Sequence, residues 1–122
     1  MNRPVHFEIQ ADNPEKIGAF YKGLFGWEIK SWEGGGDAYW LVTTGTKDVP
    51  GIDGGIMGRQ FPQAVINTTE VPDIAASLKK VAATGGKALG EPSDIPGVGK
   101  FAYCEDPEGN IFGLMQPAPQ AS

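Results

Sequence analysis

The strongest constraint on the fold of this chain is a set of sequence features that returns at one fixed spacing. Pro14-Glu15 and Pro72-Asp73 each begin a segment with helical periodicity, and they lie 58 positions apart. Gly55-Ile56-Met57 returns as Gly113-Leu114-Met115 at the same offset. Matches at both ends of the repeat predict that 122 residues, the length of one ordinary domain, contain two copies of a single supersecondary unit.

The first copy has the pattern of a strand, a helix and three further strands. Val5–Gln10 alternates apolar and polar side chains, which is typical of a strand with one buried face. Asn13-Pro14-Glu15 has the residue types of a helix N-terminus, and Gly26 predicts the helix end. The predicted buried stripe of this helix is Ile17, Phe20, Tyr21 and Leu24, and the predicted further strands are 27–32, 39–44 and 54–57, with a turn at Gly34–Asp37.

The second copy has the same order of elements. A helix with the stripe Ile74, Leu78 and Val81 follows the first strand, and Asp106–Asn110 has the residues of a hairpin turn before the last strand. The strands are predicted at 63–69, 87–89, 100–105 and 111–116. We therefore expect one domain over residues 1–117, with units at about 4–58 and 62–116, and a tail over residues 118–122.

Composition and charge exclude several classes of partner. Fifteen acidic against ten basic side chains give a formal charge of −5, and only two residues are arginine, which argues against a nucleic-acid surface. No apolar run is long enough for a membrane helix, and the first residues lack the pattern of a signal peptide. The single cysteine, Cys104, excludes an internal disulfide and is expected to be a small buried apolar residue. We expect a soluble protein of the cytoplasm that binds neither membranes nor nucleic acids.

Three segments together resemble one known superfamily. They are the strand with His6, the helix ending in Phe20-Tyr21-Lys22-Gly23-Leu24-Phe25-Gly26-Trp27, and Asp106-Pro107-Glu108-Gly109-Asn110 before the last strand. They are similar to the vicinal oxygen chelate superfamily, which contains glyoxalase I, extradiol dioxygenases and bleomycin-resistance proteins. The resemblance implies an α+β fold in which two βαβββ units form a curved, eight-stranded mixed-sheet half-barrel with a central cavity. It also implies a homodimer.

The resemblance implies a divalent metal held by residues of the first and last strands of each unit. His6 matches one ligand position, but Gly55 and Gly113 stand where the superfamily has carboxylates, and Ala64 stands where a second His or Gln belongs. Tight sites for zinc or iron need three or more protein ligands. We therefore predict no metal cofactor, with Glu8 and Gln63 left as substitute ligands for a weakly bound or substrate-completed metal.

The candidate ligand-binding residues follow from the predicted strand faces. His6 and Glu8 lie on the polar face of the first strand, and His6 is the best candidate general base because its ordinary pKa is about 6.5. Trp40 and Tyr103 are predicted to stack against a planar ligand. Gly55 and Gly113 mark either a close approach of another chain segment or room for a bulky apolar ligand. The predicted ligand-binding set is His6, Glu8, Trp40, Gly55, Met57, Tyr103, Gly113 and Met115; core packing is the alternative for the two methionines.

Three functions fit these features. The first is a small-molecule-binding protein of this superfamily that does not use the usual metal site and binds a partly apolar ligand. The second is an enzyme, a lyase, isomerase or hydrolase, that uses His6 as a base or as a weak metal ligand. The third is a non-catalytic interaction domain. The sequence does not decide whether the chain is an enzyme.

Overall fold

The computed structural model describes residues 1–32 and 38–119, and the turn predicted at Gly34–Asp37 lies outside them. The described residues form two helices and nine strands, so the protein is an α+β protein. The chain divides into two compact units. One is Val5–Ile66, and the other combines Met1–Pro4 with Asn67–Ser122.

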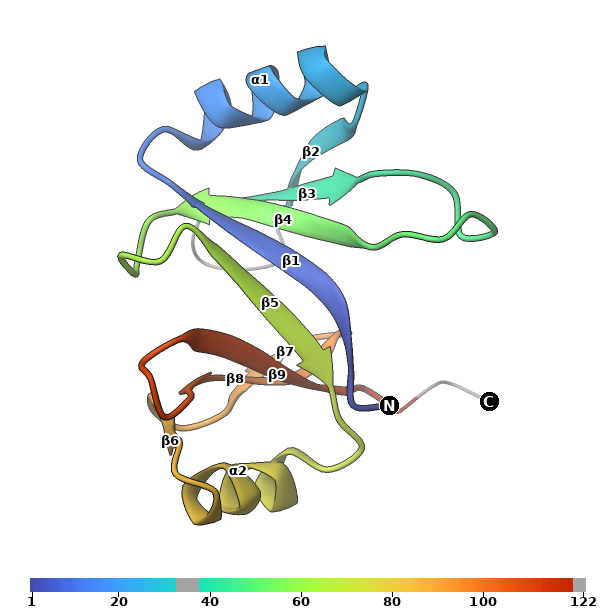
Figure 1. The fold of residues 1–122 in the computed structure, drawn as a ribbon. Coiled ribbons are helices and arrows are strands. Elements are labelled where there is room, and N and C mark those ends of the chain that lie inside the picture. The colour runs from blue at the N-terminus through green and yellow to red at the C-terminus, as the bar shows by residue number, and fades with distance from the viewer. Residues whose placement is uncertain (33–37, 120–122) are drawn as a thin grey trace. The chain divides into compact units, whose positions relative to one another are not determined.

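The unit Val5–Ile66 contains the first βαβββ arrangement (Figure 1). Its strands lie in the order β2-β3-β4-β1, with β1 and β4 parallel and the other neighbours antiparallel. Helix α1 covers one face of this sheet. The elements are β1 (Arg3–Ala11), α1 (Pro14–Phe25), β2 (Glu28–Trp32), β3 (Tyr39–Thr43) and β4 (Asp53–Gly58).

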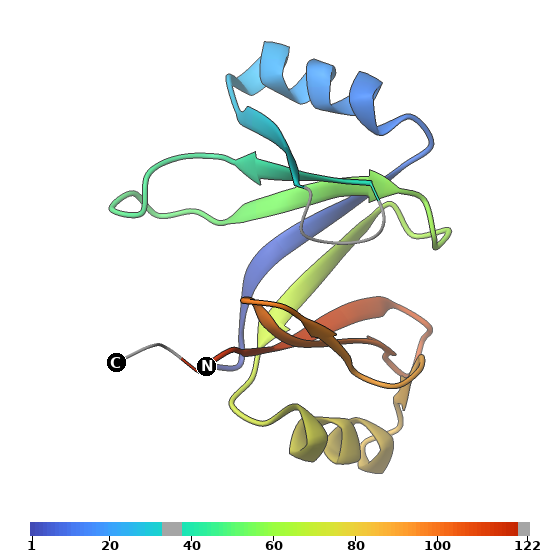
Figure 2. The same cartoon turned by 180° about the vertical axis from the view of Figure 1, so that it is seen from behind.

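The other unit repeats this arrangement, as the reverse view also shows (Figure 2). Its strands lie in the order β5-β9-β8-β6, again with a parallel first and last strand, and a short extra strand, β7, also pairs with β8. The predicted mixed sheet of two βαβββ units is confirmed, with β7 as an addition. The elements are β5 (Val65–Glu70), α2 (Ile74–Ala83), β6 (Lys87–Ala88), β7 (Ser93–Ile95), β8 (Gly99–Glu105) and β9 (Ile111–Pro117).

The ends of helix α1 are formed by the residues that the sequence indicates. The side chain of Asn13 accepts a hydrogen bond of 3.2 Å from the amide of Lys16, which satisfies one of the free donors of the first turn. Gly26 adopts a left-handed conformation with φ of 74°, and its amide donates to the carbonyl of Lys22. The predicted start and end of this helix are confirmed.

The predicted buried face of α1 is wrong in part. Ile17 packs against the core, but the side chains of Phe20 and Leu24 are each 58% exposed. The reason is Gly18, which is the buried residue of the helix. A Cβ atom at Gly18 would lie 3.3 Å from Ile29, so the helix approaches the sheet along its glycine and turns the bulkier residues outward.

Each unit has its own apolar core between helix and sheet. In the unit Val5–Ile66 the core lies around Val42 and Ile56, both almost fully buried. In the other unit, Ile74, Leu78 and Val81 of α2 pack against the buried residues of β8 and β9, which confirms the stripe predicted for this helix. Cys104 is fully buried there, as predicted, and burial raises the pKa of its thiol.

The turn between β8 and β9 is organised by one carboxylate. The side chain of Asp106 accepts hydrogen bonds from the amides of Glu108 and Asn110, each 2.9 Å, and from the Asn110 side chain. Gly109 supplies the positive φ that the turn requires. The hydrogen bonds from Asn110, followed by those from Glu108 and Gly109, lower the pKa of Asp106. The predicted hairpin is confirmed.

We predict that Asp106→Ala lowers the melting temperature, because three donors in the turn lose their acceptor. Since the folded-state pKa of Asp106 lies below its ordinary value, its contribution is present at neutral pH and is lost as the pH falls through the folded-state pKa. The difference in melting temperature between the natural protein and the variant, measured from pH 7 to pH 3 by circular dichroism, should shrink toward acid. A constant difference would mean that the charge of Asp106 does not stabilise the turn.

Candidate functional site

The polar side chains of β1 lie on the sheet face opposite helix α1. His6, Glu8 and Gln10 alternate with Phe7 and Ile9, which pack into the core under the helix. Glu8 and Gln10 are 6% and 2% exposed, so this face holds polar groups that water does not reach freely. Buried polar groups need partners, and the neighbouring strands provide them.

The strand register brings Tyr39 of β3 to this group. Its hydroxyl lies 2.9 Å from Nε2 of His6 and also makes a hydrogen bond with Glu8. The amide nitrogen of the Gln10 side chain donates to Oε1 of Glu8 at 3.0 Å, and the backbone amide of Gln60 donates to Oε1 of Gln10 at 2.8 Å. The result is one connected network that runs from His6 to the segment after β4. We call this network, formed by His6, Tyr39, Glu8, Gln10 and the Gln60 amide, the His6 network.

The place of Tyr39 depends on a glycine. Gly55 is the cross-strand partner of Glu8, and a Cβ atom at position 55 would overlap the hydroxyl and the ring of Tyr39. The tyrosine therefore fills the space in which a side chain at position 55 would begin. In the superfamily pattern, this is the position of a metal-binding carboxylate.

In the other unit an aromatic ring also packs across a glycine, but that ring carries no hydroxyl group. A Cβ atom at Gly113 would lie 2.7 Å from the ring of Phe101 and 2.9 Å from the hydroxyl of Thr68. Tyr39 pairs with the residue two positions after Gly55, and Phe101 pairs with the residue two positions after Gly113, so the two rings occupy equivalent positions. Gly55 and Gly113 therefore do not leave room for a bulky ligand, because an aromatic ring fills each space, and that prediction is wrong. The alternative prediction, that another chain segment approaches closely at each glycine, agrees with the structure.

Burial shifts the acid–base behaviour of the two central groups. Desolvation lowers the pKa of His6 below its ordinary value, and the nearby carboxylate of Asp53 opposes this shift in part. Desolvation raises the pKa of Tyr39, and the charge and hydrogen bond of Glu8 add to the increase. Around neutral pH the imidazole is uncharged and the phenol keeps its proton.

The side chains around His6 do not fit the metal that the superfamily implies. Tyr39 holds its proton more firmly than an ordinary phenol and is a poor ligand, while Glu8 is engaged by Tyr39 and Gln10. Gln63 donates its side-chain amide to the carbonyl of Val65. Within residues 1–32 and 38–119, no group of three or more His, Cys, Asp or Glu side chains could hold a metal ion.

The predicted ligand-stacking position of Trp40 is wrong. It packs on the helix side of the sheet, against the core that contains Val42 and Ile56, whereas its neighbour Tyr39 is on the face of His6. The ring of Trp32 contacts that of Tyr39 edge-on, with centroids 5.8 Å apart. Tyr39, Trp32 and Gln10 are not among the residues predicted for the site. The sequence signal that points to Tyr39 is the glycine at position 55 in the middle of a strand, because an aromatic neighbour fills its space.

The remaining predicted residues divide between the two units. Met57 is 7% exposed, and register places it opposite Gln10 and Tyr39 on the face of the His6 network. Tyr103 and Met115 lie in the other unit, where Tyr103 is paired with Gly113 and contacts Phe101 edge-on. Only His6, Glu8, Gly55 and Met57 of the predicted set come together within the unit Val5–Ile66.

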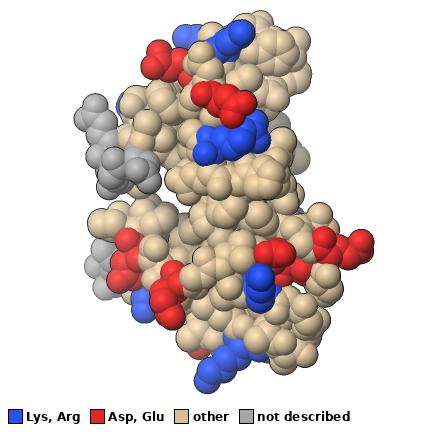
Figure 3. Space-filling view, turned by 90° about the vertical axis from the view of Figure 1, so that its left-hand side faces the viewer, with Lys and Arg blue, Asp and Glu red and all other residues tan. Residues whose placement is uncertain are grey.

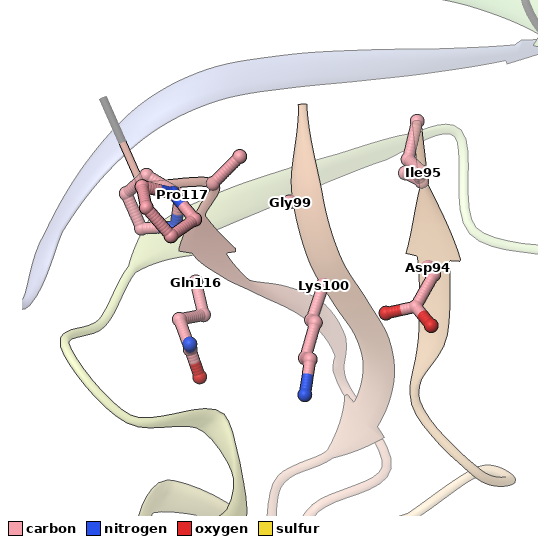
Figure 4. A pocket seen from close by; sticks show the side chains of 8 residues that line it. Asp94, Ile95, Gly99, Lys100, Gln116 and Pro117 are labelled. Carbon is pink, nitrogen blue, oxygen red and sulfur yellow. The ribbon is translucent and has the colours of Figure 1, made fainter. Parts of the chain in front are cut away.

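A small hollow lies at the edge of the other unit, away from the predicted residues. It has a volume of about 190 Å³, and Asp94, Lys100 and Gln116 extend beside one another along it (Figure 4). Gln116 already accepts a hydrogen bond from the first amide of α2 through its side-chain oxygen. The hollow is shallow and its charged side chains are exposed.

Charged side chains do not form a large surface of one sign on the face shown in Figure 3. There, the described Lys and Arg side chains lie among Asp and Glu side chains. No helix in the described part of the chain is long and apolar enough to cross a membrane.

The two βαβββ units define a class of fold, and comparison with known families assigns the chain within it. The model of the Glyoxalase/Bleomycin resistance protein/Dioxygenase superfamily matches residues 3–114. The chain belongs to this superfamily. Proteins of Mycobacterium tuberculosis and Mycobacterium bovis named "Putative glyoxylase CFP32" are 38% identical to it over 118 residues. The match covers 93% of this chain but only 43% of those relatives.

Solved structures have the same fold at low sequence identity. A methylmalonyl-CoA epimerase variant of Streptomyces coelicolor, in complex with 2-nitronate-propionyl-CoA, superposes with a TM-score of 0.73 at 15% identity, over 98% of this chain and 99% of that one. A superfamily member of Vibrio splendidus gives 0.66 at 22% identity, over 93% and 97%. These likenesses establish the fold.

We predict that Gly55→Ala destabilises the protein by about 1–3 kcal/mol, because the new methyl group overlaps the ring of Tyr39 and the sheet must shift. Urea unfolding followed by tryptophan fluorescence measures the loss. Gly45→Ala is the matched control, since nothing lies within 4 Å of a Cβ atom at that exposed glycine. Equal effects of the two substitutions would contradict the packing of Tyr39 across Gly55.

Proposed function

We propose that this chain binds a small organic molecule at the His6 network and does so without a metal at the position that its superfamily uses. The observation that carries the proposal is the network itself: buried Glu8 and Gln10, joined to His6 through Tyr39, on the sheet face that helix α1 leaves free. Burying polar groups costs free energy that their hydrogen bonds only offset, and ionisable groups with shifted pKa values gather at functional sites.

The chemistry of the network supports an uncharged ligand. Glu8 and Asp53 bring carboxylates to this face, whereas His6 is neutral at physiological pH. Trp32, beside Tyr39, adds an aromatic surface against which an apolar part of the ligand can pack. Superfamily membership supports a small-molecule ligand as well, because the structural neighbours include an enzyme solved with a coenzyme A ester analogue. We also propose that the protein is a homodimer and acts in the cytoplasm.

The proposal predicts that removing metal ions leaves ligand binding unchanged. Protein purified without a chelator should contain far less than one equivalent of zinc, iron, nickel or manganese by elemental analysis. A thermal-shift screen of small aldehydes, thiol conjugates, phenols and acyl thioesters should yield ligands whose shift is the same before and after dialysis against EDTA. A ligand shift that disappears with EDTA and returns with one metal would overturn the metal-free part of the proposal.

A second candidate function is catalysis with His6 as the base. The lowered pKa of His6 favours it, because an uncharged imidazole can accept a proton at neutral pH. The relatives named "Putative glyoxylase CFP32" also support an enzymatic function, because a glyoxylase is an enzyme. If the chain is an enzyme, NMR spectra of ligands from the screen should show conversion, and His6→Ala should lower the rate by about 10²-fold or more. Conversion that does not depend on His6 would remove this candidate.

A further inference from the structure

The hydrogen bonds of the His6 network have a defined direction. The negative charge of Glu8 contributes to the raised pKa of Tyr39, and an ionised carboxylate only accepts hydrogen bonds, so in the bond between Tyr39 and Glu8 the phenol donates its single proton. The phenol oxygen can then only accept from the imidazole, which lies 2.9 Å away through Nε2. Nε2 of His6 must therefore carry a hydrogen.

The other end of the network reinforces this direction. The backbone amide of Gln60 can only donate, so the side-chain oxygen of Gln10 accepts from it and the Gln10 nitrogen faces Glu8 as a donor. Glu8 thus accepts from both Gln10 and Tyr39. Reversing the bond between Tyr39 and His6 would take the phenol proton away from the buried carboxylate, which is unfavourable.

The second nitrogen of His6 is not fully buried. In the described part of the chain, the side chain of His6 makes its hydrogen bond through Nε2, and no buried side-chain nitrogen or oxygen lacks a partner. Nδ1 has no hydrogen bond of its own there, so it is not among the buried atoms. With Nε2 protonated and the ring neutral, Nδ1 presents a lone pair.

We propose that Tyr39, held by Glu8, fixes His6 as the Nε2–H tautomer, so that its Nδ1 accepts a hydrogen bond from an uncharged ligand with a weakly acidic O–H or N–H group. Tyr39 is a positioning residue in this arrangement. It stands in the place of the missing carboxylate, but it sets the proton position of His6 instead of holding a metal. The ligand class rests on the proposed binding function; the tautomer does not.

The charges around the site select for the neutral form of such a ligand. The carboxylates of Glu8 and Asp53 lie on this side of the sheet, and Asp53 is close enough to affect the pKa of His6. The carboxylate of Asp53 accepts hydrogen bonds from the amide and the hydroxyl of Thr44, which leave its negative charge in place. An anionic ligand would therefore be repelled, while a neutral donor would bind to Nδ1 at no electrostatic cost.

The tautomer can be measured directly because His6 is the single histidine of the chain. Two-dimensional NMR of ¹⁵N-labelled protein, with any purification tag removed, distinguishes a protonated ring nitrogen from one with a lone pair. At pH 7.5 we expect one set of signals with Nε2 protonated and Nδ1 unprotonated. A ring with Nδ1 protonated, or an even mixture of the two tautomers, would overturn the inference without any variant being needed.

The chain provides a matched pair of substitutions. Tyr39→Phe keeps the ring across Gly55, in the same way as Phe101 lies across Gly113, so the variant is expected to fold. It removes the acceptor of the Nε2 hydrogen, and both tautomers of His6 should then be populated. Phe101→Tyr makes the reverse change in the unit that has no histidine and should leave the His6 signals unchanged. Unchanged signals in Tyr39→Phe would show that Tyr39 does not set the tautomer.

Phenol and anisole test the ligand class, because they differ in the donor hydrogen and share the ring. In a titration followed by the Nδ1 signal of His6, phenol should bind at least about threefold more tightly than anisole, and Tyr39→Phe should weaken phenol binding by about 3- to 10-fold. Equal binding of the two probes would refute the donor class. If neither probe nor any compound of the screen binds while the Nε2–H tautomer is found, the proposed function fails and the inference about Tyr39 stands.

Discussion

The polar side of the sheet in the unit Val5–Ile66 depends on the packing of the Tyr39 ring across Gly55. A glycine in the middle of a strand costs conformational freedom and leaves a hole in the sheet surface. The aromatic ring closes that hole, and its hydroxyl reaches both His6 and Glu8. One contact thus fills the sheet, satisfies a buried carboxylate and orients the single imidazole of the chain.

The comparison of the two units separates what the fold requires from what the site requires. Both units have a glycine on the last strand and an aromatic ring across it, and both pack a helix on the opposite face. Only Tyr39 carries a hydroxyl, and only its unit carries a histidine. The ring is therefore part of the architecture, whereas the hydroxyl, His6 and Glu8 are additions to it. This division shows how a chain can keep the fold of its superfamily while the polar side chains of the two units differ.

Much of the fold could be predicted from the sequence because it is encoded locally. Asn13 and Gly26 mark helix ends, alternation marks β1, and the repeated glycines mark equivalent strands. The site could be predicted less well, because it depends on which face a residue takes. Trp40 and Tyr39 are neighbours, and only the register with β4 decides which of them meets His6. Phe20 is a second example: the helical period predicts a stripe that contains it, but not the rotation of the helix that buried Gly18 imposes.

The equivalence of Tyr39 and Phe101 has a consequence for the history of this sheet. The codons of phenylalanine and tyrosine differ at a single base, so a mutation can add or delete the phenolic oxygen while the ring stays in place. One genetic step can therefore add or remove the phenolic oxygen, but the oxygen completes a polar centre only in a unit that also carries the histidine and the carboxylate that it bonds.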